Sequence, residues 1–200
     1  MVKFVYLASQ SPRRRQLLEQ LGVRHELLLP DADEDAEALE AVFVNEAPAA
    51  YAKRVTSLKL DAASARLARR QLPPAPILCS DTTVALGQTI YGKPADVGHA
   101  ERMLSELSGK THRVLTAVQV QSGFRRFAAL STSRVSFEVM TGDQIRHYAA
   151  TGEPLGKAGA YAIQGRVSMH ITRINGSYSG IMGLPLWETA LLLRAAGLDV

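Results

Sequence analysis

The most constraining feature of the sequence is the stretch of residues 77–94, in which an apolar run carries a carboxylate. The run is rich in β-branched residues and follows a proline-rich segment, a pattern that predicts a buried strand. Strand alternation places Asp81 on the same face as Ile77 and Cys79, where a carboxylate is costly unless it is paired or bound to a metal. Gly87 then predicts a turn that leads into a short returning strand.

The same stretch brings a cation back towards the acid. Gly92 and Pro94 flank Lys93 and fix the backbone that carries its ammonium group. An acid inside a strand and a lysine after a tight turn suit chemistry on a polyphosphate with a metal ion. Taken alone, the stretch is equally consistent with a strand-end aspartate in a hydrogen-bonded turn and a solvated lysine, because a motif without context is weak.

Length and composition indicate one globular domain over residues 1–200. The chain is 46% hydrophobic and 21% charged, which fits a packed core rather than disorder. Its net charge of +4 is scattered along the sequence and favours small anionic ligands over nucleic acid. The single cysteine, Cys79, excludes an intramolecular disulfide and a cysteine-based zinc site. We see no membrane-spanning run and no signal peptide, and therefore expect a cytoplasmic protein without a membrane partner.

A second candidate site lies near the start of the chain. Residues 3–9 predict a strand, and Ser11 and Pro12 suit the N-cap and first position of a helix that ends at Gly22. Serines and arginines surround this helix start: Ser9, Ser11, Arg13, Arg14 and Arg15. Helix N–H groups, the helix dipole and guanidinium groups all favour a phosphate there. The alternative is a capped helix with a solvated basic turn.

An acidic segment and a long helix follow a short strand predicted at residues 24–29. Most carboxylates of residues 31–46 are expected on a solvated face, although one or two at its start could reach a metal: Asp31, Asp33, Glu34, Asp35, Glu37, Glu40 and Glu46. Residues 48–70 predict a helix with an apolar stripe at Tyr51, Val55, Leu58, Ala62 and Ala65. This helix also carries Arg54 and Lys59, and most charges on such a helix face water.

The rest of the chain alternates helices and strands. Helices are predicted from Asp96 to Gly109, from the capping box of Thr141 and Gln144, and from Pro185 onward. Strands are predicted at residues 114–121, 126–139 and 169–174. Two glycine-rich segments, residues 154–165 and 175–184, read as loops in which small residues let the backbone approach a ligand closely.

Four separated segments carry polar motifs in a fixed order. They read Leu-Ala-Ser-x-Ser-Pro-Arg-Arg (residues 7–14), Ser-Asp-Thr-x-Val…Gly-Lys-Pro (80–94), Lys-Ala-Gly-Ala-Tyr-x-Ile-Gln-Gly (157–165) and Ile-Asn-Gly-Ser-Tyr…Gly-Leu-Pro-Leu-x-Glu-Thr (174–189). Together they resemble the Maf family of nucleoside triphosphate pyrophosphatases. The resemblance implies an α/β fold of the Maf/ITPase-like type: two lobes around an elongated mixed, twisted sheet with flanking helices, and an active cleft between the lobes.

The resemblance also implies roles for individual residues. Asp81 resembles the catalytic acid of the family, and Glu34 would join it at a divalent cation, expected to be Mg²⁺ or Mn²⁺. The triphosphate would be bound by the basic and hydroxyl side chains of the motifs and of the long helix: Ser9, Ser11, Arg13, Arg14, Lys59 and Lys93. A homodimer is the family's tendency. Thr83 departs from the family pattern, since an apolar residue is common there.

The resemblance implies that the choice of base rests on Arg13, Thr82 and Gln164. The carboxamide of Gln164 can donate to one atom of the uracil or thymine edge and accept from its neighbour, although such an amide can also simply bond its own loop. In the branch that acts on 7-methylguanosine triphosphate, the matching positions look like Trp, Gln and Glu. The resemblance therefore implies hydrolysis of dTTP and UTP to the monophosphate and pyrophosphate, which would clear unwanted nucleotides. Two alternatives are a 7-methylguanosine triphosphate pyrophosphatase and a septum-formation inhibitor that acts by binding a partner.

Overall fold

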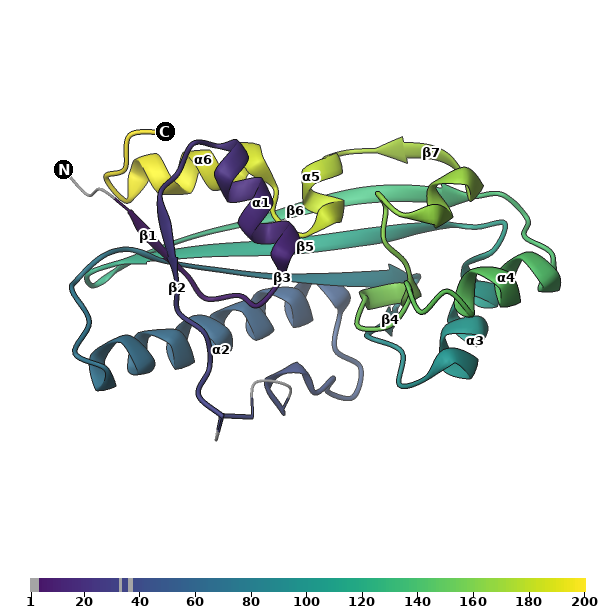
Figure 1. The fold of residues 1–200 in the computed structure, drawn as a ribbon, viewed down its shortest axis with the longest axis horizontal. Coiled ribbons are helices and arrows are strands. Elements are labelled where there is room, and N and C mark those ends of the chain that lie inside the picture. Colours follow the sequence, from purple (N-terminus) through teal and green to yellow (C-terminus); the bar gives the residue numbers. More distant parts are fainter. Residues whose placement is uncertain (1–3, 33, 36–37) are drawn as a thin grey trace.

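The computed structural model describes residues 4–32, 34–35 and 38–200 (Figure 1). Lys3, Asp33 and Glu37, which enter the sequence predictions, lie outside the described residues. The strands are β1 (Val5–Leu7), β2 (His25–Leu27), β3 (Ile77–Leu86), β4 (Thr89–Tyr91), β5 (Thr111–Ser122), β6 (Arg125–Phe137) and β7 (Ile171–Asn175). The α-helices are α1 (Pro12–Gln20), α2 (Pro48–Arg69), α3 (Val97–Leu107), α4 (Gly142–Ala149), α5 (Tyr178–Met182) and α6 (Leu186–Ala195). Short 3₁₀ helices are η1 (Ala38–Glu40), η2 (Ala158–Ala160) and η3 (Arg166–His170).

The strands form one mixed sheet in the order β2-β1-β3-β5-β6-β7, with β4 paired to β3 outside this path. Pairing is parallel between β1 and its two neighbours, β2 and β3, and antiparallel for β3 with β4 and β5 and onward through β7. The long strands β3, β5 and β6 give the sheet its elongated shape (Figure 1). The α/β class and the elongated mixed sheet predicted from the sequence are confirmed.

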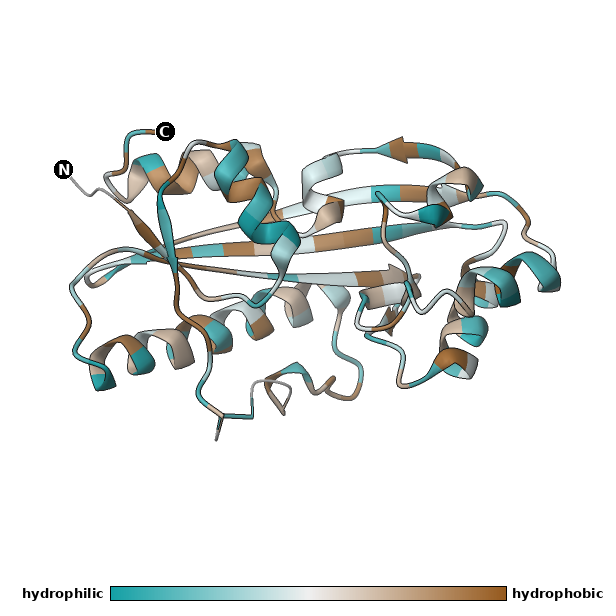
Figure 2. Cartoon of the chain, in the orientation of Figure 1, coloured by the Kyte–Doolittle hydropathy of each residue, from teal (hydrophilic) through white to brown (hydrophobic). Residues whose placement is uncertain are grey.

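Helices cover both faces of this sheet. In Figure 1, α2 runs along one face, while α1, α5 and α6 lie on the other, and α3 and α4 stand together at the far end. Figure 2 shows hydrophobic segments along the long central strands that these helices cover. Coverage on both faces explains why β3 is buried over almost its whole length and reads as a continuous apolar run.

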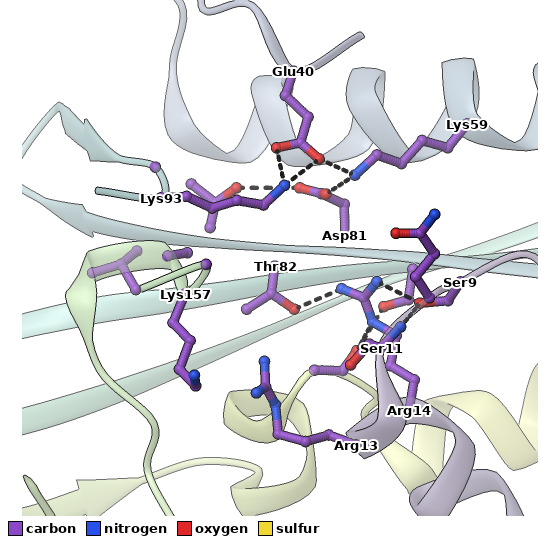
Figure 3. Close-up of a pocket in the computed structure, with 18 of the residues that line it drawn as sticks. Ser9, Ser11, Arg13, Arg14, Glu40, Lys59, Asp81, Thr82, Lys93 and Lys157 are labelled. Atoms are coloured by element: carbon purple, nitrogen blue, oxygen red, sulfur yellow. Dashed lines mark hydrogen bonds and ion pairs between the residues drawn. The ribbon is translucent and has the colours of Figure 1, made fainter. Parts of the chain in front are cut away.

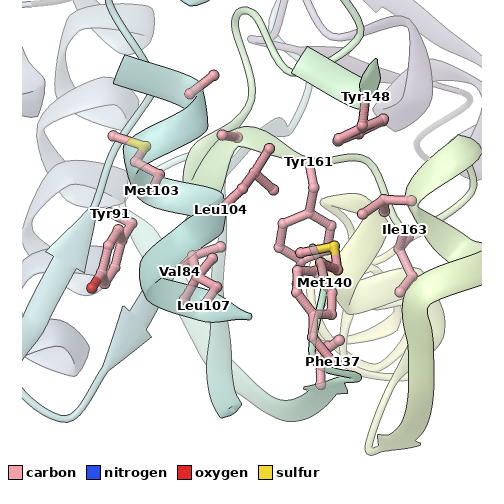
Figure 4. Close-up of a cluster of buried hydrophobic side chains, with 14 of the residues drawn as sticks. Val84, Tyr91, Met103, Leu104, Leu107, Phe137, Met140, Tyr148, Tyr161 and Ile163 are labelled. Atoms are coloured by element: carbon pink, nitrogen blue, oxygen red, sulfur yellow. The ribbon is translucent and has the colours of Figure 1, made fainter. Parts of the chain in front are cut away.

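Separate apolar clusters stabilise the two ends of the molecule. At the α3–α4 end, side chains of these helices meet the ends of the long strands and the glycine segment, as Figure 4 shows for Leu104, Phe137 and Tyr161. At the other end, α1 and α6 pack on one face of the sheet through residues such as Leu18 and Leu193. The opposite face there packs against α2 through Leu60. These ends are the two lobes expected around the sheet.

Most predicted elements are present, and several details are wrong: residues 169–170, for example, were predicted as strand but end the 3₁₀ helix η3. The face of α2 that packs on the sheet carries Ala52, Leu60 and Ala63, whereas Leu58 and Ala65 are exposed. The segment 175–184, predicted as a loop, contains α5, which begins after Ser177 because the Ser177 hydroxyl accepts a hydrogen bond from the Gly180 N–H.

Candidate functional site

A gap at one edge of β3 opens a cleft of about 670 Å³ between the lobes. On this edge β3 pairs with β1 at Ile77 and Leu78 and with β4 from Val84 to Leu86. Within the described chain no strand pairs with residues 79–83 on that side, so side chains from both faces of β3 reach one space. The volume is of the size that small-molecule sites commonly have. Its walls come from the start of α1, from α2, β3 and β4, and from residues 156–164 and 181–183.

Asp81 is the buried acid of this cleft. It is 6% exposed, and its Oδ1 lies 2.5 Å from the Nζ of Lys59 on α2. The same ammonium donates to Oε1 of Glu40 at 2.8 Å, so one cation stands between two carboxylates (Figure 3). Thr83 adds a weaker hydroxyl contact to Asp81 at 3.5 Å. The carboxylate that strand alternation predicted to need a partner therefore has a cation as that partner.

Glu40 is a site residue that the sequence reasoning missed as a specific candidate. Its carboxylate lies 3.3 Å and 3.2 Å from Nζ of Lys93, in addition to its contact with Lys59. Burial opposes ionisation of Glu40, but the two ammonium groups outweigh it and lower the pKa of this carboxyl below its usual value. The predicted hairpin therefore places Lys93 beside Glu40 and Asp81, the two carboxylates of the acidic centre, as expected. No local pattern distinguishes Glu40 from the other acids of its segment.

Glu34 lies on the cleft wall but not beside Asp81. Arg66 and Arg69 of α2 bind its carboxylate, with Arg66 Nε at 3.0 Å and Arg69 at 2.6 Å. The hydrogen bonds from Arg66 lower the pKa of Glu34 from 4.5 to about 2. The structure therefore places Glu34 in an arginine cluster, and it places Glu40 in the position beside Asp81 that the sequence analysis expected for Glu34.

Two neighbouring arginines at the start of α1 have different surroundings. Arg14 donates to the Gly183 carbonyl at 2.8 Å, to Ser9 Oγ at 3.2 Å and to Thr82 Oγ1 at 3.4 Å. It is half-buried, and loss of solvent around the guanidinium lowers its pKa. Arg13 donates only through Nε, to the Met182 carbonyl at 3.2 Å. In the part of the chain that the structure describes, its terminal nitrogens have no partner, so Arg13 is the cation open to an anion.

The hydroxyl groups of Ser9 and Ser11 also differ in their hydrogen bonds. Ser9 Oγ accepts from the Ser11 N–H at 3.2 Å as well as from Arg14. Ser11 occupies the predicted N-cap position, but its hydroxyl makes no capping hydrogen bond. The first N–H groups of α1 therefore have no side-chain cap and lie at the cleft, where they favour an anion.

The third wall comes from the glycine segment. Gly159 has φ of +69° and lies so close to Val84 of β3 that a Cβ would overlap its methyl groups. Lys157 lines the cleft opposite Arg13 (Figure 3), and burial followed by the charge of Arg13 lowers its pKa. Lys157 was quoted within a motif but was not assigned a role, so it is a further cation that the sequence analysis missed.

Gln164 and Thr82 line the same cleft with different freedom. Gln164 is exposed, and within residues 4–32, 34–35 and 38–200 its carboxamide has no hydrogen-bond partner. This excludes the alternative in which the amide bonds its own loop. Thr82 Oγ1 instead lies 3.0 Å from Thr116 Oγ1 and accepts a hydrogen bond from Arg14. Residues from all four predicted motifs therefore meet around one space, and Glu34 lines the same space away from Asp81.

The donor set of the acidic centre suits a divalent cation that shares its coordination with a ligand. Among the described residues no group of three or more His, Cys, Asp or Glu side chains could hold a metal ion alone. Asp81 and Glu40 provide two carboxylates that share one ammonium. Mg²⁺ is commonly bound by one or two carboxylates together with substrate phosphates and water, so these residues fit such an ion.

Comparison with known proteins gives the family. The model of the family described as Maf-like protein matches residues 4–196. The chain belongs to the Maf family. A similar Maf relative from Polaromonas sp. (strain JS666) is 71% identical over 197 residues, 98% of each chain, and is named dTTP/UTP pyrophosphatase. A relative of the same name from Albidiferax ferrireducens is 68% identical over 200 residues, covering 100% of both chains.

Two further findings concern structure. A nucleoside-triphosphatase (dITP/XTP pyrophosphatase) from Mycobacterium abscessus is similar with a TM-score of 0.38 and 11% identity, over 66% of this chain and 73% of that chain. A TM-score this low supports no conclusion about the Maf fold. Within the described residues, none of the helices has both the length and the apolar character that crossing a membrane requires.

Proposed function

We propose that this Maf-family chain hydrolyses dTTP and UTP to the nucleoside monophosphates and pyrophosphate. The observation that carries the proposal is the cleft at the open edge of β3, where Asp81 and Glu40 on one side of the strand and the basic helix start on the other line one space of nucleotide size. The names of full-length relatives with up to 71% identity point to the same reaction. Removal of unwanted nucleotides from the cytoplasmic pool is the role that we infer.

In the proposed reaction a water molecule attacks the α-phosphorus and pyrophosphate leaves. Asp81 is the group that orients this water or accepts its proton, because it is the buried carboxylate at the edge of the cleft. Negative charge on the phosphates has to be neutralised as the bond breaks. Lys59 and Lys93 supply positive charge beside the acid. On the other wall, Arg13 supplies positive charge and the N–H groups of α1 supply hydrogen-bond donors.

Asp81 and Glu40 are the residues that would hold a divalent cation together with the phosphates. When bound there, a cation such as Mg²⁺ or Mn²⁺ would neutralise phosphate charge. The two carboxylates bind Lys59, which keeps both of them paired inside the protein.

We assign recognition of the uracil or thymine base to Gln164. Its unpaired carboxamide lines the cleft and can meet the carbonyl and N3–H of uracil or thymine with a donor and an acceptor. Arg13 and Thr82 stand at the other two positions that separate the pyrimidine branch from the 7-methylguanosine branch. The 7-methylguanosine branch has Trp, Gln and Glu at the positions of Arg13, Thr82 and Gln164, and this chain has none of the three there, which supports the pyrimidine assignment.

A substrate panel tests the proposal. The wild-type protein should be assayed with dTTP, UTP, CTP, GTP and 7-methylguanosine triphosphate, each with Mg²⁺ or Mn²⁺, and the products should be separated by chromatography. We expect the highest kcat/KM for dTTP and UTP. A preference for 7-methylguanosine triphosphate, or no turnover of any triphosphate, would contradict the proposed function.

A further inference from the structure

The backbone on both sides of Gln164 is held by side chains that do not line the cleft. On one side, the Ala162 N–H donates to the hydroxyl of Tyr148 at 3.4 Å. On the other side, the Arg166 N–H donates to both carboxylate oxygens of Glu153, at 3.1 Å and 3.2 Å. The exposed amide of Gln164 therefore extends from a short backbone segment that is anchored before and after it.

The two anchors are joined to each other. The Tyr148 hydroxyl donates to Oε1 of Glu153 at 2.8 Å. Tyr148 is 5% exposed, since its ring packs in the apolar cluster that also holds Tyr161 and Ile163 (Figure 4). It lies on α4, whose start is fixed by the capping box of Thr141. Burial and then the hydrogen bond to Glu153 raise the pKa of Tyr148, so the hydroxyl keeps its proton and can donate.

Gly165 makes the close approach of Glu153 possible. A Cβ at this position would overlap the Glu153 carboxylate, although φ of Gly165 is not in the left-handed region. The glycine is therefore required by the space that the carboxylate fills, not by its own backbone angles. Its N–H also closes a turn by donating to the Ala162 carbonyl at 2.8 Å, so the segment around Gln164 is held by its own turn and by both anchors.

We propose that Tyr148 and Glu153 are positioning residues for base recognition, which fix the backbone around Gln164 so that its amide faces the cleft before a nucleotide binds. This inference rests on the proposed function of Gln164. A backbone held in place reduces the freedom that the Gln164 side chain loses on binding and keeps its donor and acceptor close to the base edge. Cytosine presents the opposite pattern to uracil at this edge, so a displaced amide loses selectivity between UTP and CTP.

The test measures kcat and KM for UTP and CTP in wild type and in the variants Tyr148→Phe, Glu153→Ala, Glu153→Gln and Gly165→Ala. A site that reads a base by hydrogen bonds loses discrimination when those groups move, so we expect the UTP/CTP ratio of kcat/KM to fall by about 10-fold to 100-fold in Glu153→Ala. For UTP we expect most of the loss as a rise in KM, because the substitution leaves Asp81 and the groups around it, which are proposed to act in the chemical step, unchanged. Glu153→Gln retains an oxygen for the Arg166 N–H and should keep more selectivity.

Two variants make the test specific. Gly165→Ala should reproduce Glu153→Ala, because the new methyl group displaces the same carboxylate. Asp143→Asn is the matched control, since Asp143 is an exposed acid on α4 whose ion pair is with Arg146. It should leave the UTP/CTP ratio unchanged. Thermal unfolding of every variant identifies any that fail to fold, and Tyr148→Phe keeps the packed ring, so it provides a folded test.

The outcomes separate this inference from the proposed function. If wild type prefers UTP over CTP and Tyr148→Phe and Glu153→Ala fold with the same preference, the positioning role is wrong while the function stands. If selectivity falls in both and in Gly165→Ala, the inference is supported. If wild type does not hydrolyse UTP, the proposed function fails and this inference fails with it.

Discussion

Replacement of Asp81 by asparagine should remove turnover and leave the fold intact. Asparagine keeps the side-chain volume and an oxygen that can still accept from Lys59, which lies 2.5 Å away in the wild type. Lys59 also keeps its contact with Glu40 at 2.8 Å. A hydrogen bond to a charged group contributes about 1.5–3 kcal/mol, and part of it survives, so we expect a loss of about 1–2 kcal/mol of unfolding free energy.

The kinetic effect should be far larger than the effect on stability. Loss of a general base costs about 10²–10⁴-fold in rate, and loss of a metal ligand adds to this. For a chain of this size, the expected loss of unfolding free energy corresponds to a fall in Tm of about 2–8 °C. The assays are pyrophosphate release from UTP under saturating conditions and calorimetric unfolding of the same preparation.

The control is the same substitution at Asp61. This aspartate lies on α2 and pairs at the surface with Arg126. Asp61→Asn should leave kcat within the error of the wild type, because exposed ion pairs contribute little. If Asp81→Asn folds and turns over UTP within a few-fold of the wild type, Asp81 has only a structural role and the reasoning is refuted.

Three further predictions concern the acids and the cation. Glu40→Gln should lower kcat strongly, whereas Glu34→Gln should mainly lower Tm, because it leaves the buried guanidinium of Arg66 without its carboxylate; equal kinetic losses would contradict this division. Activity should vanish with EDTA and return with Mg²⁺ or Mn²⁺, and full turnover in chelator would reject a metal requirement. The folded-state pKa of Glu34 lies below its ordinary value, so its contribution to stability is complete above pH 4.5 and is lost as the pH falls towards about 2. Denaturant unfolding between these pH values should therefore be less pH-dependent in Glu34→Gln, and an unchanged slope would oppose the assignment.

The parts of the site that could be predicted from the sequence are those formed by residues close together in the chain. Asp81 and Lys93 belong to one hairpin, so an apolar run, a turn and a Gly-Lys-Pro motif are enough to bring them to one region. Ser11 and Pro12 likewise mark the start of α1, as capping preferences require. In both places the chain segment itself determines the geometry.

The parts that were missed depend on contacts between distant segments. Glu40 meets Lys59 19 positions later in the sequence, and nothing near Glu40 indicates this partner. The same applies to Arg66, which the sequence analysis did not single out and which is 3% exposed, bound to Glu34 and to the Leu28 carbonyl. The pairing of Glu34 and Glu40 with basic side chains of α2 depends on how the acidic segment lies against this helix, which the sequence alone does not show.

Small residues explain the remaining errors. On α2, alanines occur on several faces, so spacing alone did not decide between Leu58 and Leu60 as the buried leucine. The structure buries Leu60 because that face meets β1 and β3 near Cys79. The short helix α5 was missed because Gly180 lies within it and Gly183 follows it, and glycine lowers helix propensity.

The position of the oxygen that water contributes tests the central claim most directly. UTP should be hydrolysed in water enriched in ¹⁸O with the wild-type protein, and the products should be separated and analysed by mass spectrometry. Attack at the α-phosphorus predicts UMP and pyrophosphate, with one ¹⁸O in UMP and none in pyrophosphate. Label in the pyrophosphate, or UDP with orthophosphate as the products, would contradict the proposed reaction.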